Sequence, residues 1–153
     1  QMRNSAASKI TTTEKLPNRP VFIIGNYHTR YNWCKWNRNI LWSDGKHNPA
    51  NNPCPDGFRV PTKDEWLEEI ATWETLDAYG DYNSVLKLPA AGIRSWNGDL
   101  HAVGTFVSCW SSTTRENRKE RSSYYMEATT RPNSAMAYGG SRGSALSVRC
   151  IKK

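Results

Sequence analysis

Four carboxylate side chains gather between residues 64 and 69, where paired acids could carry general acid–base chemistry. The four are Asp64, Glu65, Glu68 and Glu69. They follow Thr62, and Thr62 with Glu65 three positions later has the pattern of a helix capping box. Acidic residues are favoured in the first turn of a helix because the helix N-terminus carries partial positive charge. We therefore interpret the cluster as the first turn and solvated face of a helix.

Cysteine and histidine side chains could bind a metal ion or act as nucleophiles. The cysteines are Cys34, Cys54, Cys109 and Cys150, and the histidines are His28, His47 and His101. No two cysteines form a C-x-x-C pair, so the spacing of a zinc site is absent, and we expect no metal and no cofactor. The residues alone allow two disulfides in three pairings, or free thiols as in a reducing cytoplasm.

The net charge of the chain is +7. This charge fits either a soluble basic surface or attraction to an acidic partner such as nucleic acid, an anionic glycan or a bacterial surface. The densest basic run, residues 115 to 123, is interrupted by Glu116 and Glu120 and is typical of a solvated loop. No nucleic-acid-binding signature accompanies it, so we expect no nucleic-acid partner. No apolar run is long enough to span a membrane, and we expect no membrane insertion.

One helix followed by several short strands is expected to position these residues. Trp66, Ile70 and Trp73 recur at helical spacing within the stretch 61–76. Apolar or alternating patterns predict strands at 21–24, within 84–95, and at 108–114, 122–130 and 144–153. The fold class is therefore α+β with an antiparallel sheet. Residues 1–18 are polar and predict a flexible N-terminal lead-in, and residues 19–153 are enough for a single domain.

Four segments occur in an order and spacing that resemble a known family. They are NNPCPDGFRVPTKDEW (51–66), LKLPAAGIRSWNGDLHAVG (86–104), CWSSTT (109–114) and ALSVRCIKK (145–153). Together they resemble the bacterial and phage C-type-lectin-like domains described as Fibrobacter major paralogous domains. The similarity is closest to the variable proteins of diversity-generating retroelements, and it covers residues 40 to 153. The formylglycine-generating sulfatase-modifying enzymes share a looser version of GFRVPTKDEW.

The resemblance implies a C-type lectin fold, in which helices flank a small irregular antiparallel sheet. In variable proteins of this kind, residues encoded at template adenines change between copies while the scaffold between them stays fixed. Here that variable region spans about residues 93–145. Trp110, Ser111 and Ser112 match the fixed scaffold, with Trp110 in the core and the serines bonded to nearby backbone groups.

The resemblance also implies which side chains are displayed to a ligand. The candidates are Ser95, Trp96, Asn97, His101, Phe106, Val107, Cys109, Tyr125, Arg131, Asn133, Met136, Tyr138, Ser141 and Arg142. Two alternatives stay open. Trp96 is also compatible with a core position. One of Tyr124 and Tyr125 is expected in the core, since adjacent residues on a strand face opposite sides.

The fold implied by the resemblance brings Cys54 and Cys150 together, and we predict that they pair in an oxidised protein. A bridge that closes so long a loop contributes on the order of 4–5 kcal/mol. Cys34 and Cys109 are then left over, and a second bridge between them is an open alternative.

The implied function is non-enzymatic display of a binding surface. The partner would be a protein or glycan receptor on a host or neighbouring cell surface, with several copies of the domain in a larger assembly adding avidity. The location would be a virion or a cell surface outside the cell, although the chain shows no signal-peptide pattern. One alternative is a fixed structural or adhesin module. Another is an oxidase of the formylglycine-generating type, with Cys109 as its candidate cysteine.

Overall fold

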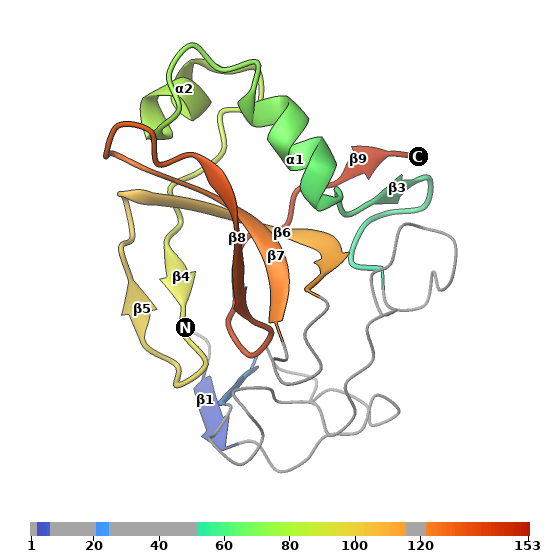
Figure 1. Ribbon diagram of the computed structural model, residues 1–153. Helices are drawn as coiled ribbons and strands as arrows, with labels where there is room; N and C mark the ends of the chain where they lie inside the picture. Colours follow the sequence, from blue (N-terminus) through green and yellow to red (C-terminus); the bar gives the residue numbers. More distant parts are fainter. Residues whose placement is uncertain (1–2, 7–20, 25–51, 116–121) are drawn as a thin grey trace.

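A computed structural model describes residues 3–6, 21–24, 52–115 and 122–153 of the chain. Its strands and helices, in chain order, are β1 (Arg3–Ala6), β2 (Val21–Ile24), β3 (Phe58–Arg59), α1 (Lys63–Ile70), α2 (Ala78–Asn83), β4 (Ile93–Arg94), β5 (Leu100–His101), β6 (Phe106–Thr114), β7 (Ser122–Thr129), β8 (Met136–Ser141) and β9 (Ile151–Lys152) (Figure 1). Two short helices with small, mostly antiparallel sheets confirm the α+β class.

The sheet β6–β7–β8 is the largest in the described part of the chain, with β7 in its centre. Both of its strand pairs are antiparallel, and the pairing of β6 with β7 is interrupted by a register shift between Trp110 and Thr114. Helices α1 and α2 lie together at one side of this sheet, with α1 above β6, β7 and β8 (Figure 1). The predicted strands at 108–114 and 122–130 are confirmed as β6 and β7.

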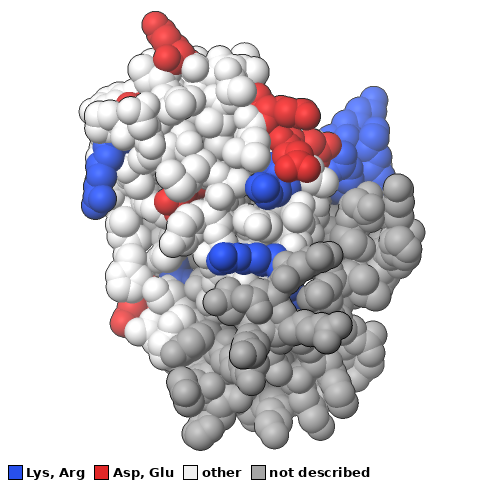
Figure 2. Space-filling model, viewed as in Figure 1, with Lys and Arg blue, Asp and Glu red and all other residues white. Residues whose placement is uncertain are grey.

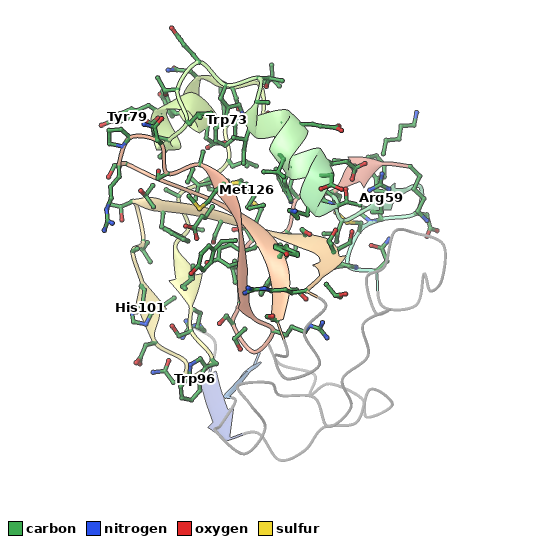
Figure 3. All side chains as sticks on the ribbon, viewed as in Figure 1. Arg59, Trp73, Tyr79, Trp96, His101 and Met126 are labelled. Atoms are coloured by element: carbon green, nitrogen blue, oxygen red, sulfur yellow. A yellow bond between two sulfur atoms is a disulfide. The ribbon has the colours of Figure 1, made fainter. Side chains whose placement is uncertain are left out.

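The core lies between α1 and the sheet. Trp66, Ile70 and Trp73 are buried there, as their spacing predicted, together with Met126 of β7. Met126 and Trp73 lie beneath and beside the helix in Figure 3. The indole N–H of Trp66 donates to the backbone carbonyl of Trp110, 3.2 Å away, so the helix is tied to the sheet as well as packed on it.

The predicted capping box forms at the start of α1. The Thr62 hydroxyl accepts from the backbone N–H of Glu65, and the Glu65 carboxylate accepts from the backbone N–H of Thr62. The helix ends at Ile70, earlier than the stretch 61–76 suggested. The backbone N–H groups of Thr72 and Trp73 donate three residues back, which tightens the chain into a turn that still buries Trp73.

Helix α2 was not expected from the sequence. Asp77 is its N-cap, and its carboxylate accepts from the backbone N–H groups of Tyr79 and Gly80. A side chain at position 80 would bring Cβ within 1.8 Å of the Thr75 carbonyl oxygen, so glycine is required for this tight approach. The N-cap residue Asp77 is not followed by apolar residues at helical spacing, so the sequence pattern is too weak to predict so short a helix.

Two strand predictions were too long. Within 84–95 only Ile93–Arg94 is a strand, and within 144–153 only Ile151–Lys152 is one. The segment before β9 makes single bridges instead, from Ala145 to Arg94 and from Ser147 to Cys109. It therefore pairs with β4 and β6 at single residues rather than as a continuous strand.

The predicted strand at 21–24 is β2, and it pairs in parallel with β1. Strand β1 lies within the lead-in for which the composition suggested no regular structure. The other residues of 1–18, and Cys34, lie outside the described residues.

A disulfide joins two segments that lie far apart in the sequence. Strands β3 and β9 pair antiparallel, and next to them Cys54 and Cys150 form a disulfide with 5.8 Å between their Cα atoms. The predicted pairing is therefore confirmed. In the described ranges, no helix combines the length and apolar character needed to cross a membrane.

Candidate ligand-binding surface

The two faces of the sheet have different environments. Val107 and Cys109 of β6 and Met126 and Ala128 of β7 belong to the core beneath α1. Because side chains alternate along a strand, Tyr125 and Glu127 point to the opposite face. The register places Tyr138 opposite Tyr125, and Met136 opposite Glu127. We call these four residues the tyrosine face.

A row of aromatic rings crosses the sheet on this side. The Trp110 and Tyr125 ring centroids are 5.8 Å apart with an angle of 82° between the planes. The Tyr125 and Tyr138 centroids are 6.1 Å apart at 73°. Trp110 is 6% exposed and Tyr138 is 55% exposed, so the row runs from the interior to solvent. The prediction that Trp110 is a core residue is confirmed.

Glycine in β8 makes room for this row. A Cβ atom at Gly140 would come within 2.7 Å of Cε1 of Tyr125. The Tyr125 ring therefore lies against backbone that carries no side chain. The position of the ring depends on Gly140 as well as on Tyr125 itself.

A carboxylate lies beside the central ring. Burial, a hydrogen bond to the Glu127 carboxylate and the negative charge of Glu127 raise the pKa of Tyr125 above its ordinary value. Tyr125 therefore stays protonated and can donate its hydroxyl hydrogen. Sequence reasoning missed Glu127. Its position two residues after Tyr125 on an alternating strand was the signal that could have placed it on this face.

The hairpin β4–β5 carries four of the candidate residues. At its tip the backbone N–H of Gly98 donates to the Ser95 carbonyl, and the Asn97 side-chain N–H donates to Asp99. Asn97 and His101 are exposed, whereas Ser95 and Trp96 are half-buried. Figure 3 shows Trp96 and His101 on this hairpin, well away from Trp73. The half-buried Trp96 lies between the two alternatives that the sequence left open.

The hairpin is fixed to the sheet at its base. Gly92 donates from its backbone N–H to the carbonyl of Phe106, and its own carbonyl accepts from the Ser108 hydroxyl. Gly92 has a φ of 70°, and a Cβ atom there would lie 2.3 Å from the His101 carbonyl oxygen. Glycine is thus needed at position 92.

Two predicted display residues are wrong. Val107 and Cys109 are each only 2% exposed. Residues 107 to 112 are all buried. Val107 and Cys109 lie in the core beneath α1, and on the other face the Ser108 hydroxyl donates to the Gly92 carbonyl. Burial also raises the pKa of the Cys109 thiol to about 12. Phe106, at the start of the strand, is half-buried.

Of the remaining candidates, two are exposed and two are half-buried. Arg131 and Asn133 are exposed in the loop between β7 and β8, and Asn133 adopts a φ of 54°. Ser141 is half-buried in β8. Arg142 is also half-buried, and its guanidinium donates to the Ser122 carbonyl and the Ser123 hydroxyl. Arg142 therefore helps to hold the start of β7.

Large apolar and aromatic side chains are also exposed at positions outside the candidate set. Leu100 is 58% exposed and Val103 is 63% exposed. Tyr79 and Tyr82 of α2, which the sequence did not single out, are 62% and 69% exposed. Tyr79 lies at the edge of the molecule in Figure 3.

The charges on the visible face are mixed. Figure 2 shows acidic side chains gathered over α1 and basic ones directly beside them over the region of β3 and β9, with mostly uncharged residues over the rest of the described part of this face. At the start of α1, Arg59 and Glu65 form an ion pair that lowers the pKa of Glu65 to about 2. In the ranges that the structure covers, no three histidine, cysteine or acidic residues are grouped so that they could hold a metal ion.

In comparisons with known proteins, no protein-family model, no curated protein and no solved structure matches this chain.

Proposed function

We propose that this chain is a ligand-binding domain of the C-type-lectin-like class, similar to the variable proteins of diversity-generating retroelements. The observation that carries the proposal is the separation of two groups of residues. Trp110, Ser111 and Ser112 are buried, and Trp110 and Ser112 bond to Trp66 of α1 and to Pro61 just before it. In contrast, the exposed candidates on the hairpin, the β7–β8 loop and β8 are Asn97, His101, Arg131, Asn133, Met136 and Tyr138. A display protein needs such a division.

The hydrogen bonds of the buried serines support the scaffold role. The Ser112 hydroxyl and backbone N–H both donate to the Pro61 carbonyl, and the Ser111 hydroxyl accepts from the backbone N–H of Thr113. The neighbouring Thr113 hydroxyl accepts from the backbone N–H of Lys63, the first residue of α1. These bonds fix the helix to β6 without using any exposed candidate.

The exposed candidates suit adaptable recognition. Tyrosine gives large contact area at low conformational cost, and asparagine and arginine add varied hydrogen bonds. The partner would be a protein or glycan on a host or neighbouring cell surface. The Cys54–Cys150 disulfide favours an oxidising location, such as a virion or the outside of a cell.

The geometry favours binding over oxidase chemistry. A reactive cysteine needs an accessible thiolate, and such thiols have lowered pKa values. Cys109 is buried and its pKa is raised to about 12, while Cys54 and Cys150 are joined to each other. None of these three cysteines suits the role of the oxidase nucleophile.

The first experiment is to sequence the DNA that flanks the gene. The proposal predicts a near-copy of the codons for about residues 93–145 that differs chiefly at adenines, next to a reverse-transcriptase gene. The absence of both would remove diversification and leave a fixed adhesin or structural module.

The second experiment tests display directly. Single substitutions at the exposed positions other than Asn133, whose φ of 54° disfavours most other residues, are expected to leave the thermal midpoint almost unchanged, since each exposed site contributes within about 0.5 kcal/mol. The matched control is the same substitution set at Val107 and Ser111, which are 2% exposed. Equal sensitivity at both sets would contradict the proposal.

A further inference from the structure

The turn of the β4–β5 hairpin contains Asn97–Gly98, the only Asn-Gly pair in the sequence. An asparagine side chain has a carbonyl carbon that the backbone nitrogen of the next residue can attack, which closes a five-membered ring. Glycine has no Cβ atom to hinder this approach. Asn97 itself is exposed. The pair therefore combines an accessible amide with the least hindered nucleophile that a backbone offers.

The folded turn holds the groups of this pair by hydrogen bonds. The backbone N–H of Gly98 donates to the Ser95 carbonyl, 2.8 Å away. The Asn97 side-chain N–H donates to the Asp99 carboxylate over 2.7 Å, and the side-chain carbonyl of Asn97 accepts from the backbone N–H of Asp99 over 3.2 Å. The last bond closes an Asx turn, which folds the amide back over the Gly98 peptide. The reacting groups are thus adjacent, but both nitrogens are bonded to other partners.

Opening of the turn frees both nitrogens. Strands β4 and β5 pair through only two residues each. A two-stranded ribbon this short is marginally stable, and exposed turns open at a low cost in free energy. The Arg94 guanidinium adds one bond across the turn, to the Gly98 carbonyl 2.7 Å away. The hydrogen bonds of the turn therefore set how often the amide and the Gly98 nitrogen can meet.

We propose that Asn97–Gly98 is a site of spontaneous deamidation, in which an exposed amide becomes a carboxylate. The Gly98 nitrogen forms a bond to Cγ of Asn97, and the bond from Cγ to Nδ2 breaks. The Gly98 hydrogen, relayed through water, leaves with Nδ2 as ammonia. Water then opens the cyclic imide at Cγ to give aspartate, or at the backbone carbonyl carbon to give isoaspartate, in which the main chain runs through Cγ.

The reaction changes the surface that the hairpin displays. A carboxylate at position 97 faces Asp99 where the amide now donates to it, and two like charges at that distance repel. Isoaspartate adds one carbon to the main chain of the turn. Both products remove the amide donor of Asn97, one of the candidate binding residues. The inference goes beyond the proposed function, because the reaction requires neither a ligand nor diversification of the gene.

The test is incubation of the full chain in mildly alkaline buffer, followed by tryptic digestion and mass spectrometry. Cleavage after Arg94 and Arg115 releases residues 95–115, in which Asn97 is the only asparagine and no glutamine occurs. Conversion of an amide to a carboxylate in this peptide therefore has one origin. Electron-transfer fragmentation separates isoaspartate from aspartate.

Asn133 is the internal control in the same digest. It is also exposed, but Ser134 follows it, and the Cβ atom of serine hinders ring closure. Conversion at Asn97 is expected to be several times faster than at Asn133. A peptide 95–115 that stays unmodified, or that converts no faster than Asn133, would overturn the proposal.

The turn contacts have their own comparison. Asp99→Ala removes the acceptor of the Asn97 amide and should speed conversion about 2- to 10-fold, the factor expected for loss of one net hydrogen bond. Asp56→Ala, at an exposed carboxylate outside the hairpin, is the control and should leave the rate unchanged. The isolated 95–115 peptide should convert faster than the folded chain, and this comparison holds even if thermal unfolding shows that Asp99→Ala does not fold. Equal rates in the peptide and the folded chain would contradict the role given to the turn.

Discussion

At the scale of single residues, the pKa of a side chain in this protein depends on the groups that it contacts. Glu65 shows this most clearly: it completes the capping box of α1 and also receives two hydrogen bonds from the Arg59 guanidinium. Hydrogen bonds from Arg59 and Thr62 and the positive charge of Arg59 lower the pKa of Glu65 from 4.5 to about 2, and burial acts in the opposite direction. One carboxylate thus couples the helix start to β3.

The Glu65 contacts predict a loss of stability in acid. A lowered folded-state pKa gives stability that is fully present above pH 4.5 and is lost as the pH falls toward 2. Because the side chain is 31% exposed, solvent screening limits the contribution to on the order of 1–2 kcal/mol. Urea unfolding at pH 6 and pH 3 should show a smaller acid loss in Glu65→Gln than in the parent.

The matched control for this prediction is Glu68→Gln, at an exposed position of the same helix. Comparison of variants is needed because burial raises the pKa of Asp81, and this carboxyl acts in the opposite sense. Its favourable contribution is present at low pH and is lost as the pH rises through its folded-state pKa. An equal acid loss in Glu65→Gln and the parent would contradict the role of the Arg59 pair.

The Cys109 thiol is predicted not to react with thiol reagents in the folded protein. Cys109 is 2% exposed, so a reagent cannot reach its thiol. The pKa of this thiol is raised to about 12, so almost none of the reactive thiolate is present at neutral pH. In a Cys34→Ser chain, a thiol-specific chromogenic reagent should label about one cysteine in strong denaturant and almost none in buffer. Rapid labelling of the native protein would show that β6 opens or that Cys109 is displayed after all.

At the scale of elements, helix α1 packs against the sheet through one of its faces only. Trp66 and Ile70 are buried against the sheet, while Leu67 on the neighbouring face is 40% exposed. Eight residues are too few to form a stable helix alone, so the packing of this face must provide the stability.

Trp66→Ala should therefore destabilise the domain by about 3–5 kcal/mol, because it leaves a large cavity and removes the bond to the Trp110 carbonyl. Leu67→Ala, on the same helix, should cost less than about 1 kcal/mol. Denaturant midpoints compare the two variants. Similar losses for both would mean that α1 does not dock through its predicted face.

At the scale of the whole molecule, the Cys54–Cys150 disulfide ties the segment before β3 to the segment before β9. The two strands themselves pair through only two residues each, so the hydrogen bonds between them are few. The covalent link therefore has a large share in keeping these parts of the chain together.

Loss of this disulfide should lower the stability by about 2–5 kcal/mol, since the unfolded chain regains the freedom of a long loop. The measurement is thermal unfolding of a Cys54→Ser, Cys150→Ser double variant. Its control is the parent chain with and without a reducing agent. A double variant as stable as the oxidised parent would contradict the role of the bridge.

The sequence alone determined the features that depend on neighbouring residues. The capping box at Thr62, the buried stripe from Trp66 to Trp73 and the strands at 108–114 and 122–130 follow from local spacing, and the structure contains them. The pairing of Cys54 with Cys150 came from the resemblance to a family, and the structure has it too.

Only the tertiary structure decided which side of each strand is covered and by what. Alternation along β6 separates Cys109 from Trp110, but it does not say that both faces of that strand are buried. The register of β7 with β8 aligns Tyr125 with Tyr138 and Glu127 with Met136, and this depends on contacts between strands rather than on either segment. Whether the second face of a strand is buried, and which residues oppose each other across two strands, depend on packing between distant parts of the chain, and alternation along one strand does not specify either.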